Sequence, residues 1–274
     1  MHIRFRLNRY RRVAGIAAAG MLALLSSGCG GVFSPPENTS EGIPLATLVG
    51  GPPATSNTAT PREKLTPSGV PATDGVIVQA GDSIGVGLGA DDWAAIQHLG
   101  LPPGIAIHNV SVSGQWMLTG LGERDKNLYP HRDPRHTSVL LIQQGTNDLF
   151  GGNTAPYLYQ NILKPFVEFS QAAGFYVAVD TILPRKDDGW MSDPAHERER
   201  LAYNDLVRAN SVGADMVIDI AADPEIGDRT DPALSVMYAD KVHPSRAGQE
   251  RLAKIYAEPL GLMLQYPPRA PASR

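Results

Sequence analysis

The sequence predicts a three-layer α/β/α domain in which a five-stranded parallel sheet lies between layers of helices. Three observations favour this fold class. The chain has 274 residues, short apolar runs alternate with segments of helical periodicity, and the alternation begins only after a long stretch rich in Pro, Gly, Ser and Thr. Strands that alternate with helices are typical of repeated βα units, which build a parallel sheet covered on both faces.

Five short apolar runs are the predicted strands, and they cover residues 76–80, 105–110, 138–143, 175–180 and 216–219. Between them, helical periodicity covers residues 92–99, 157–173 and 194–212. We expect Gly174 and Gly213 to end the second and third of these helices, because glycine is common just past a helix end.

A last helix is expected to begin near Ser245, with Leu252, Ile255 and Tyr256 spaced to pack on the sheet. Pro259 limits this prediction, because a proline inside a helix removes a hydrogen bond and ends or kinks the helix. The helix is therefore expected as far as residue 257, and whether residues 260–264 continue it stays open.

The first 29 residues have the pattern of an export signal. An apolar run at residues 13–25 leads through small residues to Cys29, and it is too short to span a bilayer comfortably. Five arginines precede the run: Arg4, Arg6, Arg9, Arg11 and Arg12. The segment that ends at Cys29 resembles a bacterial lipobox, whose cysteine is acylated, although Ser26 stands where a lipobox usually has Leu. An ordinary cleaved signal with an incidental cysteine is the alternative.

The chain is expected to divide into a signal peptide (1–29), a disordered linker (30–74), one folded domain (75–264) and a flexible tail (265–274). The expected location is outside the cytoplasm, in the periplasm or cell envelope if Cys29 carries a lipid anchor to the membrane, and otherwise secreted.

Composition excludes several kinds of function. A net charge of -4 gives no basic field to gather phosphates, so nucleic acid is not an expected partner. Cys29 is the only cysteine, so the folded domain holds no disulfide, thiolate metal site or cysteine nucleophile. The histidines outside the proposed site have no metal-ligand spacing and are read as surface or loop residues, so no metal or cofactor is expected: His98, His108, His131, His136 and His196.

Polar residues follow the predicted strands where a parallel sheet places its ligands, at the carboxyl ends. The first strand runs into the sequence GDSIG, which contains Ser83, the second is followed by SVSG with Gly114, and the third by GTND with Asn147. The sequence DKVHP, with Asp240 and His243, follows the fifth strand directly before the last helix.

These residue types suit nucleophilic catalysis. A serine hydroxyl such as that of Ser83 needs a neighbouring base to take its proton, and His243 is the candidate. Asp240 lies three residues before it, close enough for one loop to hold a carboxylate against the imidazole. Each residue alone also has an ordinary structural explanation, as a helix cap, a turn glycine or a loop charge. Their joint occurrence at successive strand ends favours a catalytic site instead.

The four blocks, in this order, resemble those of the SGNH hydrolase superfamily of GDSL-like esterases and lipases, over residues 76–264. The resemblance implies a flavodoxin-like α/β/α fold and an esterase that needs no cofactor, with an acyl-enzyme on Ser83. It also implies an oxyanion hole made by the backbone N–H groups of Ser83 and Gly114 and the side-chain amide of Asn147. The opening block departs from the common family version, with Ile84 in place of Leu.

Two competing motifs are weaker. GDSIG also satisfies the G-x-S-x-G pattern of α/β-hydrolases, but there the serine follows several strands and not the first. Gly85, Gly87 and Gly89 lack the spacing of a dinucleotide-binding loop.

The substrate is the least determined feature. The expected partner is a small-molecule or glycan ester, with an O-acetylated carbohydrate or another short-chain ester preferred. Transfer of the acyl group to a sugar hydroxyl, and lysophospholipase or thioesterase activity, are the alternatives. Trp116, Ile182 and Leu183 are candidates for lining a pocket for the acyl or leaving group, and burial under loops explains them equally well.

Overall fold

The computed structural model describes residues 67–227 and 236–272, and within them five strands form one sheet in the order β2-β1-β3-β4-β5. All four pairs are parallel, which confirms the predicted fold class. The strands are β1 (Asp74–Gly81), β2 (Gly104–Asn109), β3 (Ser138–Gln143), β4 (Tyr176–Asp180) and β5 (Met216–Ile218). The predicted signal peptide, Cys29 and nearly all of the predicted linker lie outside the described residues.

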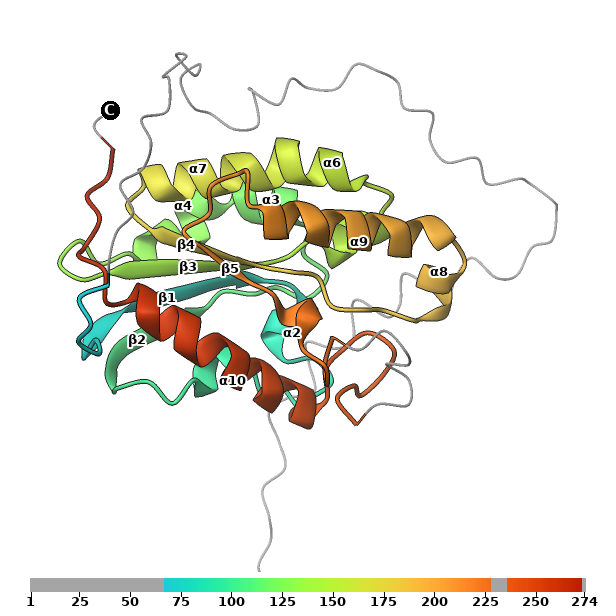
Figure 1. The fold of residues 1–274 in the computed structure, drawn as a ribbon, viewed down its shortest axis with the longest axis horizontal. Coiled ribbons are helices and arrows are strands. Elements are labelled where there is room, and N and C mark those ends of the chain that lie inside the picture. Colours follow the sequence, from blue (N-terminus) through green and yellow to red (C-terminus); the bar gives the residue numbers. More distant parts are fainter. Residues whose placement is uncertain (1–66, 228–235, 273–274) are drawn as a thin grey trace, which may run out of the picture. The chain divides into compact units, whose positions relative to one another are not determined.

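Helices cover both faces of the sheet, as Figure 1 shows. One layer contains α3 (Met117–Gly122), α4 (Arg124–Asn127), α6 (Ala155–Tyr157), α7 (Lys164–Ala172) and α9 (Pro194–Ala209). The other contains α2 (Ser83–Val86) and α10 (Arg246–Met263). The remaining helices are α5 (Thr146–Phe150) and α8 (Asp188–Met191), with a π-helical stretch at Leu158–Leu163 and 3-10 turns at Ala95–His98, Tyr129–His131 and Ile220–Ala222. No described helix has both the length and the apolar character needed to cross a membrane.

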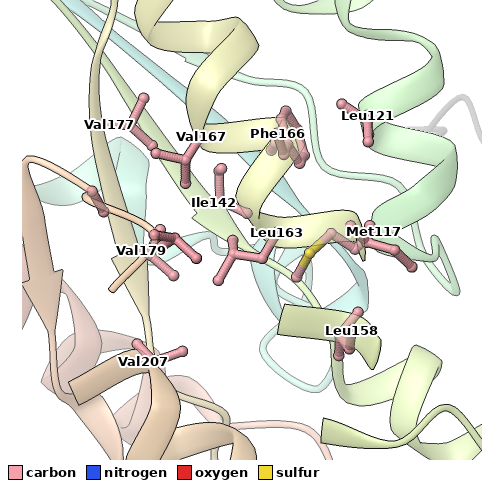
Figure 2. Packing of buried hydrophobic residues seen from close by; sticks show 14 of the residues in the cluster. Met117, Leu121, Ile142, Leu158, Leu163, Phe166, Val167, Val177, Val179 and Val207 are labelled. Carbon is pink, nitrogen blue, oxygen red and sulfur yellow. The ribbon is translucent and has the colours of Figure 1, made fainter. Parts of the chain in front are cut away.

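Two cores result from the alternation of side chains along the strands. In β1, Val78 packs into the cluster beneath α7 and α9, whereas its neighbour Ile77 packs into the cluster beneath α10. Figure 2 shows the first cluster, in which Phe166 and Leu163 lie over Ile142 of β3. Both faces of β1 and β3 are buried, which explains why these strands read as continuous apolar runs.

The predicted helix at residues 92–99 is wrong over most of its length. Asp91 and Asp92 have positive φ angles of 53° and 59°, so the chain turns there and only Ala95–His98 form a 3-10 turn. The helix predicted at 194–212 ends earlier, at Ala209, because Asn210 adopts the left-handed conformation at φ 50°. Asparagine tolerates this conformation, so it ends a helix as glycine does.

The last helix continues through Pro259 to Met263, which settles the open question about its length. The fully buried side chains of Leu260 and Met263 pack in the core beneath the helix and offset the hydrogen bond that Pro259 cannot donate. The helix predicted at 157–173 is likewise longer, starting at residue 155. Its π-helical stretch lies directly before Pro165, which also lacks a backbone donor.

The predicted flexible tail is also wrong for residues 266–272, which lie against the sheet. The guanidinium of Arg269 forms an ion pair with Asp215 at 2.7 Å and donates a hydrogen bond to the carbonyl of Phe175 at 2.8 Å. The Tyr176 hydroxyl donates to the carbonyl of Pro267 at 2.9 Å. Sequence composition cannot reveal such a fixed segment, because its order comes from contacts with residues far away in the chain.

Candidate active site

The first strand ends in a turn that places Ser83 at the start of α2. The Asp82 side chain caps this helix by accepting a hydrogen bond from the backbone N–H of Ile84 at 2.9 Å. Gly87 ends the helix in the left-handed conformation, at φ 89°, where an L side chain is strained. The turn is therefore fixed at both ends, and Ser83 is buried apart from a small exposed fraction.

A hydrogen-bonded set of polar side chains packs against this turn from the neighbouring strands. Asn109, at the end of β2, donates to the carbonyl of Gly85 at 2.7 Å and accepts a hydrogen bond from the Ser111 hydroxyl at 2.6 Å. Gln79 of β1 donates to Gln143 of β3 at 2.8 Å. A Cβ on Gly85 would lie 2.4 Å from both Gln79 and Ser111, so only glycine lets the turn approach these side chains.

Ser83, His243 and Asp240 form a chain of hydrogen bonds. The His243 Nε2 atom lies 3.0 Å from Ser83 Oγ, and His243 Nδ1 lies 2.8 Å from Asp240 Oδ2. The second oxygen of Asp240 accepts from the backbone N–H groups of Val242 and His243, each at 2.7 Å. Partial burial raises the pKa of Asp240, but the hydrogen bonds from His243 and Val242 outweigh it, so the pKa lies below its ordinary value and the carboxylate is ionised at neutral pH.

The loop that holds His243 is fastened to the loop after β4. The backbone N–H of Lys186 donates to the carbonyl of Lys241 at 2.9 Å, and the Lys241 ammonium lies 2.8 Å from Asp188. On its other side the loop contacts Gly89, where a Cβ would lie 3.0 Å from that of His243. These contacts hold the imidazole at a fixed distance from Ser83.

Backbone donors are available beside Ser83. Across residues 67–227 and 236–272, the N–H groups of Ser83 and Gly114 donate to no acceptor. Gly114 has a φ of 74°, and the loop that carries it is tied to the end of β1 by the hydrogen bond from Val112 N–H to the carbonyl of Gly81 at 3.1 Å. The Asn147 side-chain amide donates to the carbonyl of Gln115, the residue after Gly114, at 3.2 Å. The three predicted donors therefore lie on neighbouring segments at the carboxyl ends of the strands: Ser83 at the start of α2, Gly114 on the loop after β2 and Asn147 in α5.

Asp148, the last residue of the GTND block, holds the end of the loop that carries Gly114, where α3 begins. Its Oδ2 atom accepts a hydrogen bond from the backbone N–H of Met117, the first residue of α3, at 2.9 Å. The side chain is fully buried, and this burial raises its pKa to about 6.

The three residues predicted to line a substrate pocket lie in different surroundings. Trp116 is 42% exposed, and its indole ring lies against Gly151, where a Cβ would be 2.3 Å from the ring. Ile182 and Leu183 are buried and line a small cavity, so they match the alternative of burial and not that of an open substrate pocket. The reason is that residues 182–183 continue the buried end of β4 before the chain reaches the surface.

Sequence reasoning missed Gln249 and Asn109, two residues that hold the Ser83 turn. The Gln249 side chain is buried on α10, donates to the carbonyl of Ile84 at 2.8 Å and accepts from the N–H of Ala95 at 3.0 Å. The available signal was a glutamine in the apolar stripe that also contains Leu252. For Asn109, the signal was a polar side chain at a strand end.

Several described histidines make contacts outside this site, with aromatic rings or with a carboxylate. His98 stacks on Trp93 at 3.9 Å, and His108 stacks on His131 at 4.2 Å between ring centroids. His136 lies 3.1 Å from a carboxylate oxygen of Asp133. In the described part of the chain, no three His, Cys, Asp or Glu side chains are grouped so that they could hold a metal ion.

A parallel α/β/α sheet with a hydrogen-bonded Ser, His and Asp at the carboxyl ends of its strands defines a class of serine-dependent hydrolase. The family model described as GDSL-like Lipase/Acylhydrolase family matches residues 80–251, which is more than half of the chain. The chain belongs to this family, and it is an SGNH-type ester hydrolase.

Solved structures share the fold at low sequence identity. TesA is 24% identical, with a TM-score of 0.53 over 69% of this chain and 99% of TesA. A GDSL-like lipase from Bacteroides thetaiotaomicron VPI-5482 is 16% identical, with a TM-score of 0.51 over 69% of this chain and 88% of that one. No curated protein sequence matches the chain.

Proposed function

We propose that this protein hydrolyses carboxylic esters through an acyl-enzyme on Ser83, with His243 as the base and Asp240 as the residue that orients it. The observation that carries the proposal is the unbroken chain Asp240–His243–Ser83, with contacts of 2.8 and 3.0 Å. His243 accepts the hydroxyl proton as the serine oxygen bonds to the ester carbonyl carbon, and later returns it to the departing alcohol. Water, deprotonated by His243, then releases the acid.

The same proposal assigns the oxyanion hole to the N–H groups of Ser83 and Gly114 and the amide of Asn147. Support comes from the two backbone donors, which have no acceptor within the described residues and are therefore free to bind an oxygen that gains charge. The left-handed conformation of Gly114 supports the assignment further, because it leaves the donor uncovered by a side chain.

Serine labelling tests the mechanism. Ser83→Ala should abolish ester hydrolysis and covalent labelling by a fluorophosphonate, whereas Ser68→Ala, which removes an exposed hydroxyl, should retain the activity and the labelling. Folding is checked by circular dichroism. Persistent turnover by folded Ser83→Ala enzyme would overturn the proposal.

We further propose that the substrate is an O-acetylated carbohydrate or a similar short-chain ester. The supporting observation is Trp116, an exposed indole that is fixed against Gly151 and lies two residues from Gly114. A rigid aromatic face beside the reacting carbonyl suits the apolar face of a sugar ring, because little conformational entropy is lost when the ring binds it.

The substrate proposal predicts a change that depends on the substrate. Trp116→Ala should raise KM for acetylated oligosaccharides by about three- to tenfold, the value of one aromatic contact, and leave KM for p-nitrophenyl acetate almost unchanged. Tyr157→Ala, at another exposed aromatic residue, is the matched control. Activity only on long-chain lysophospholipids or thioesters, or acyl transfer to a sugar acceptor in preference to water, would contradict it.

Export and anchoring are proposed on sequence grounds, from the arginine-rich start, the apolar run at 13–25 and Cys29. The mature protein should partition into detergent, and Cys29→Ala should release it or block processing. Mass spectrometry that finds a mature N-terminus elsewhere, without lipid, would exclude the anchor and leave the esterase proposal untouched.

A further inference from the structure

A small cavity lies directly behind the Ser83 turn, where β1, β3 and β4 end. Its volume is about 20 Å³, which is enough for one water molecule. Two carboxyl groups line it, those of Asp82 and Asp180, and both side chains are buried. Thr146 and Thr181 add hydroxyl-bearing side chains to its wall. Apolar side chains also line the cavity, but its carboxyl and hydroxyl groups supply the several polar partners that an ordered water needs.

Few hydrogen bonds stabilise charge on these two carboxyl groups. Asp82 accepts one from the backbone N–H of Ile84 at 2.9 Å, and Asp180 accepts one from the hydroxyl of Tyr256 at 2.6 Å. No salt bridge joins either carboxylate to a cation within the described residues. An ionised carboxylate that is buried without a paired cation is strongly disfavoured, so protonation is the usual outcome.

The groups around the pair are mostly acidic or neutral. Asp148 of α5 repels a charge on Asp82, and Asp82 repels a charge on Asp180. Tyr256 of α10 and Tyr203 of α9 also interact with Asp180. Among the described residues, the cation that acts on Asp82 is Arg185, which is already paired with Asp187. Burial raises the pKa of Asp82 to about 7 and that of Asp180 well above its ordinary range.

We propose that Asp82 and Asp180 share one proton across a water molecule held in this cavity, and that the pair limits negative charge behind the nucleophile. In this arrangement the protonated carboxyl donates to the water, the water donates to the ionised carboxylate, and the net charge of the pair is at most one. Asp82 and Asp180 thus act through the Ser83 turn and not on the substrate, since both are buried and line the cavity behind that turn.

The proposal rests on the proposed function and adds a pH limit to it. Asp82 adjoins Ser83, whose N–H is the assigned oxyanion donor, so a full charge on Asp82 opposes the negative oxygen of the transition state. Loss of protons from the pair as the pH rises above about 7 should therefore lower turnover. A change in structure alone would lower turnover equally at all pH values.

Carboxyl titration by 13C NMR tests the pair without any substrate. In the wild-type chain, the Asp82 and Asp180 carboxyl carbons should titrate far above those of exposed aspartates. Because Asp82 ionises first and its charge repels a charge on Asp180, Asp82→Asn should lower the pKa of Asp180 by about one unit or more. Asp180→Asn should instead raise the pKa of Asp82, because the ionised carboxylate loses the protonated partner that stabilises it across the water. Asp74→Asn, at an exposed aspartate at the start of β1, should change neither pKa.

Kinetics tests the consequence. Wild-type kcat should fall at high pH, on the order of fivefold by pH 9, which is less than the loss of one oxyanion donor costs. Asp82→Asn should abolish the fall, because asparagine can accept the same hydrogen bond from Ile84 and cannot ionise. Asp74→Asn should keep the wild-type profile.

The proposal fails if the two carboxyl groups titrate independently, so that neither Asn variant shifts the pKa of the remaining carboxyl. It also fails if both carboxyls titrate near pH 4. A high-resolution crystal structure in which the cavity is empty would contradict the bridging water. The NMR result does not depend on turnover, so a chain that shows the coupled titration but hydrolyses no ester would refute the proposed function and retain the pair.

Discussion

The side chain of Gln249 on α10 donates a hydrogen bond to the carbonyl of Ile84, the residue after Ser83, at 2.8 Å. The same amide accepts a hydrogen bond from the N–H of Ala95 at 3.0 Å. One buried side chain of the final helix therefore satisfies two backbone groups of the loop that carries the nucleophile.

Gln249→Ala should lower the free energy of unfolding by about 2 to 3 kcal/mol, because it leaves two buried backbone groups without partners. It should also reduce kcat, since the Ser83 turn loses its support. Urea denaturation and steady-state kinetics measure the two effects. Glu250→Ala, which removes an exposed side chain on the next residue, should change stability by less than about 0.5 kcal/mol. Equal effects of the two variants would contradict this role for Gln249.

His243→Ala should reduce turnover at least as severely as Asp240→Ala, because His243 moves the proton and Asp240 only holds the ring and supports its charge. Either change combined with Ser83→Ala should add little further loss, since members of one catalytic unit are not additive. Short-chain p-nitrophenyl esters provide the assay. Near-normal turnover by folded His243→Ala enzyme would require the base to be sought elsewhere.

Stability should fall as the pH rises from 5 to 8. Burial raises the folded-state pKa of Asp148 to about 6, so the folded chain holds a proton that the unfolded chain releases near pH 4. The folded state is then favoured at low pH, and this advantage is lost as the pH rises through 6. An asparagine at this position cannot ionise, so in Asp148→Asn the free energy of unfolding should fall by about 1 kcal/mol less between pH 5 and pH 8 than in the wild type. Urea denaturation at both pH values measures the difference. A variant as pH-dependent as the wild type would show that Asp148 is ionised in the folded chain.

Arg269→Ala should destabilise the fold by about 2 to 3 kcal/mol, because Asp215 is mostly buried and would lose its charged partner. The control is Lys164→Ala, which removes an exposed partner of Glu168 and should have almost no effect. Thermal unfolding measures both. An Arg269 variant as stable as the control would show that the C-terminal contacts contribute little.

The strands and the site blocks could be predicted because both depend on local pattern. Buried parallel strands such as residues 138–143 need an unbroken apolar run, and that prediction matches β3 at both ends. The position of Ser83 followed from polar residues placed directly after such a run, and that of His243 from the DKVHP block directly before the last helix. The parallel arrangement explains why Ser83 lies at the carboxyl ends of the strands, but its 3.0 Å contact with His243 depends on the loop before α10 and could not be read from the sequence.

The remaining features depend on contacts between distant segments. Asp180 was read as the end of a strand, and nothing local shows that it lies near Asp82, about a hundred residues earlier in the chain. The order of residues 266–272 comes from Asp215 and Tyr176, and the continuation of α10 past Pro259 comes from the core beneath it. In each case burial or a charged partner determined the structure, and not the conformational preference of the local sequence.

The residues of the site are far apart in the sequence, which has a consequence for biosynthesis. Ser83 and His243 are 160 positions apart, and Gln249 and Tyr256 also belong to the last helix. A ribosome that makes the chain from its N-terminus completes all five strands before it adds His243, so the nascent protein can form its sheet while its serine still lacks an adjacent imidazole. Hydrolytic competence therefore arises late, when the last segment packs against the sheet, and chains that stop short of His243 should be inert.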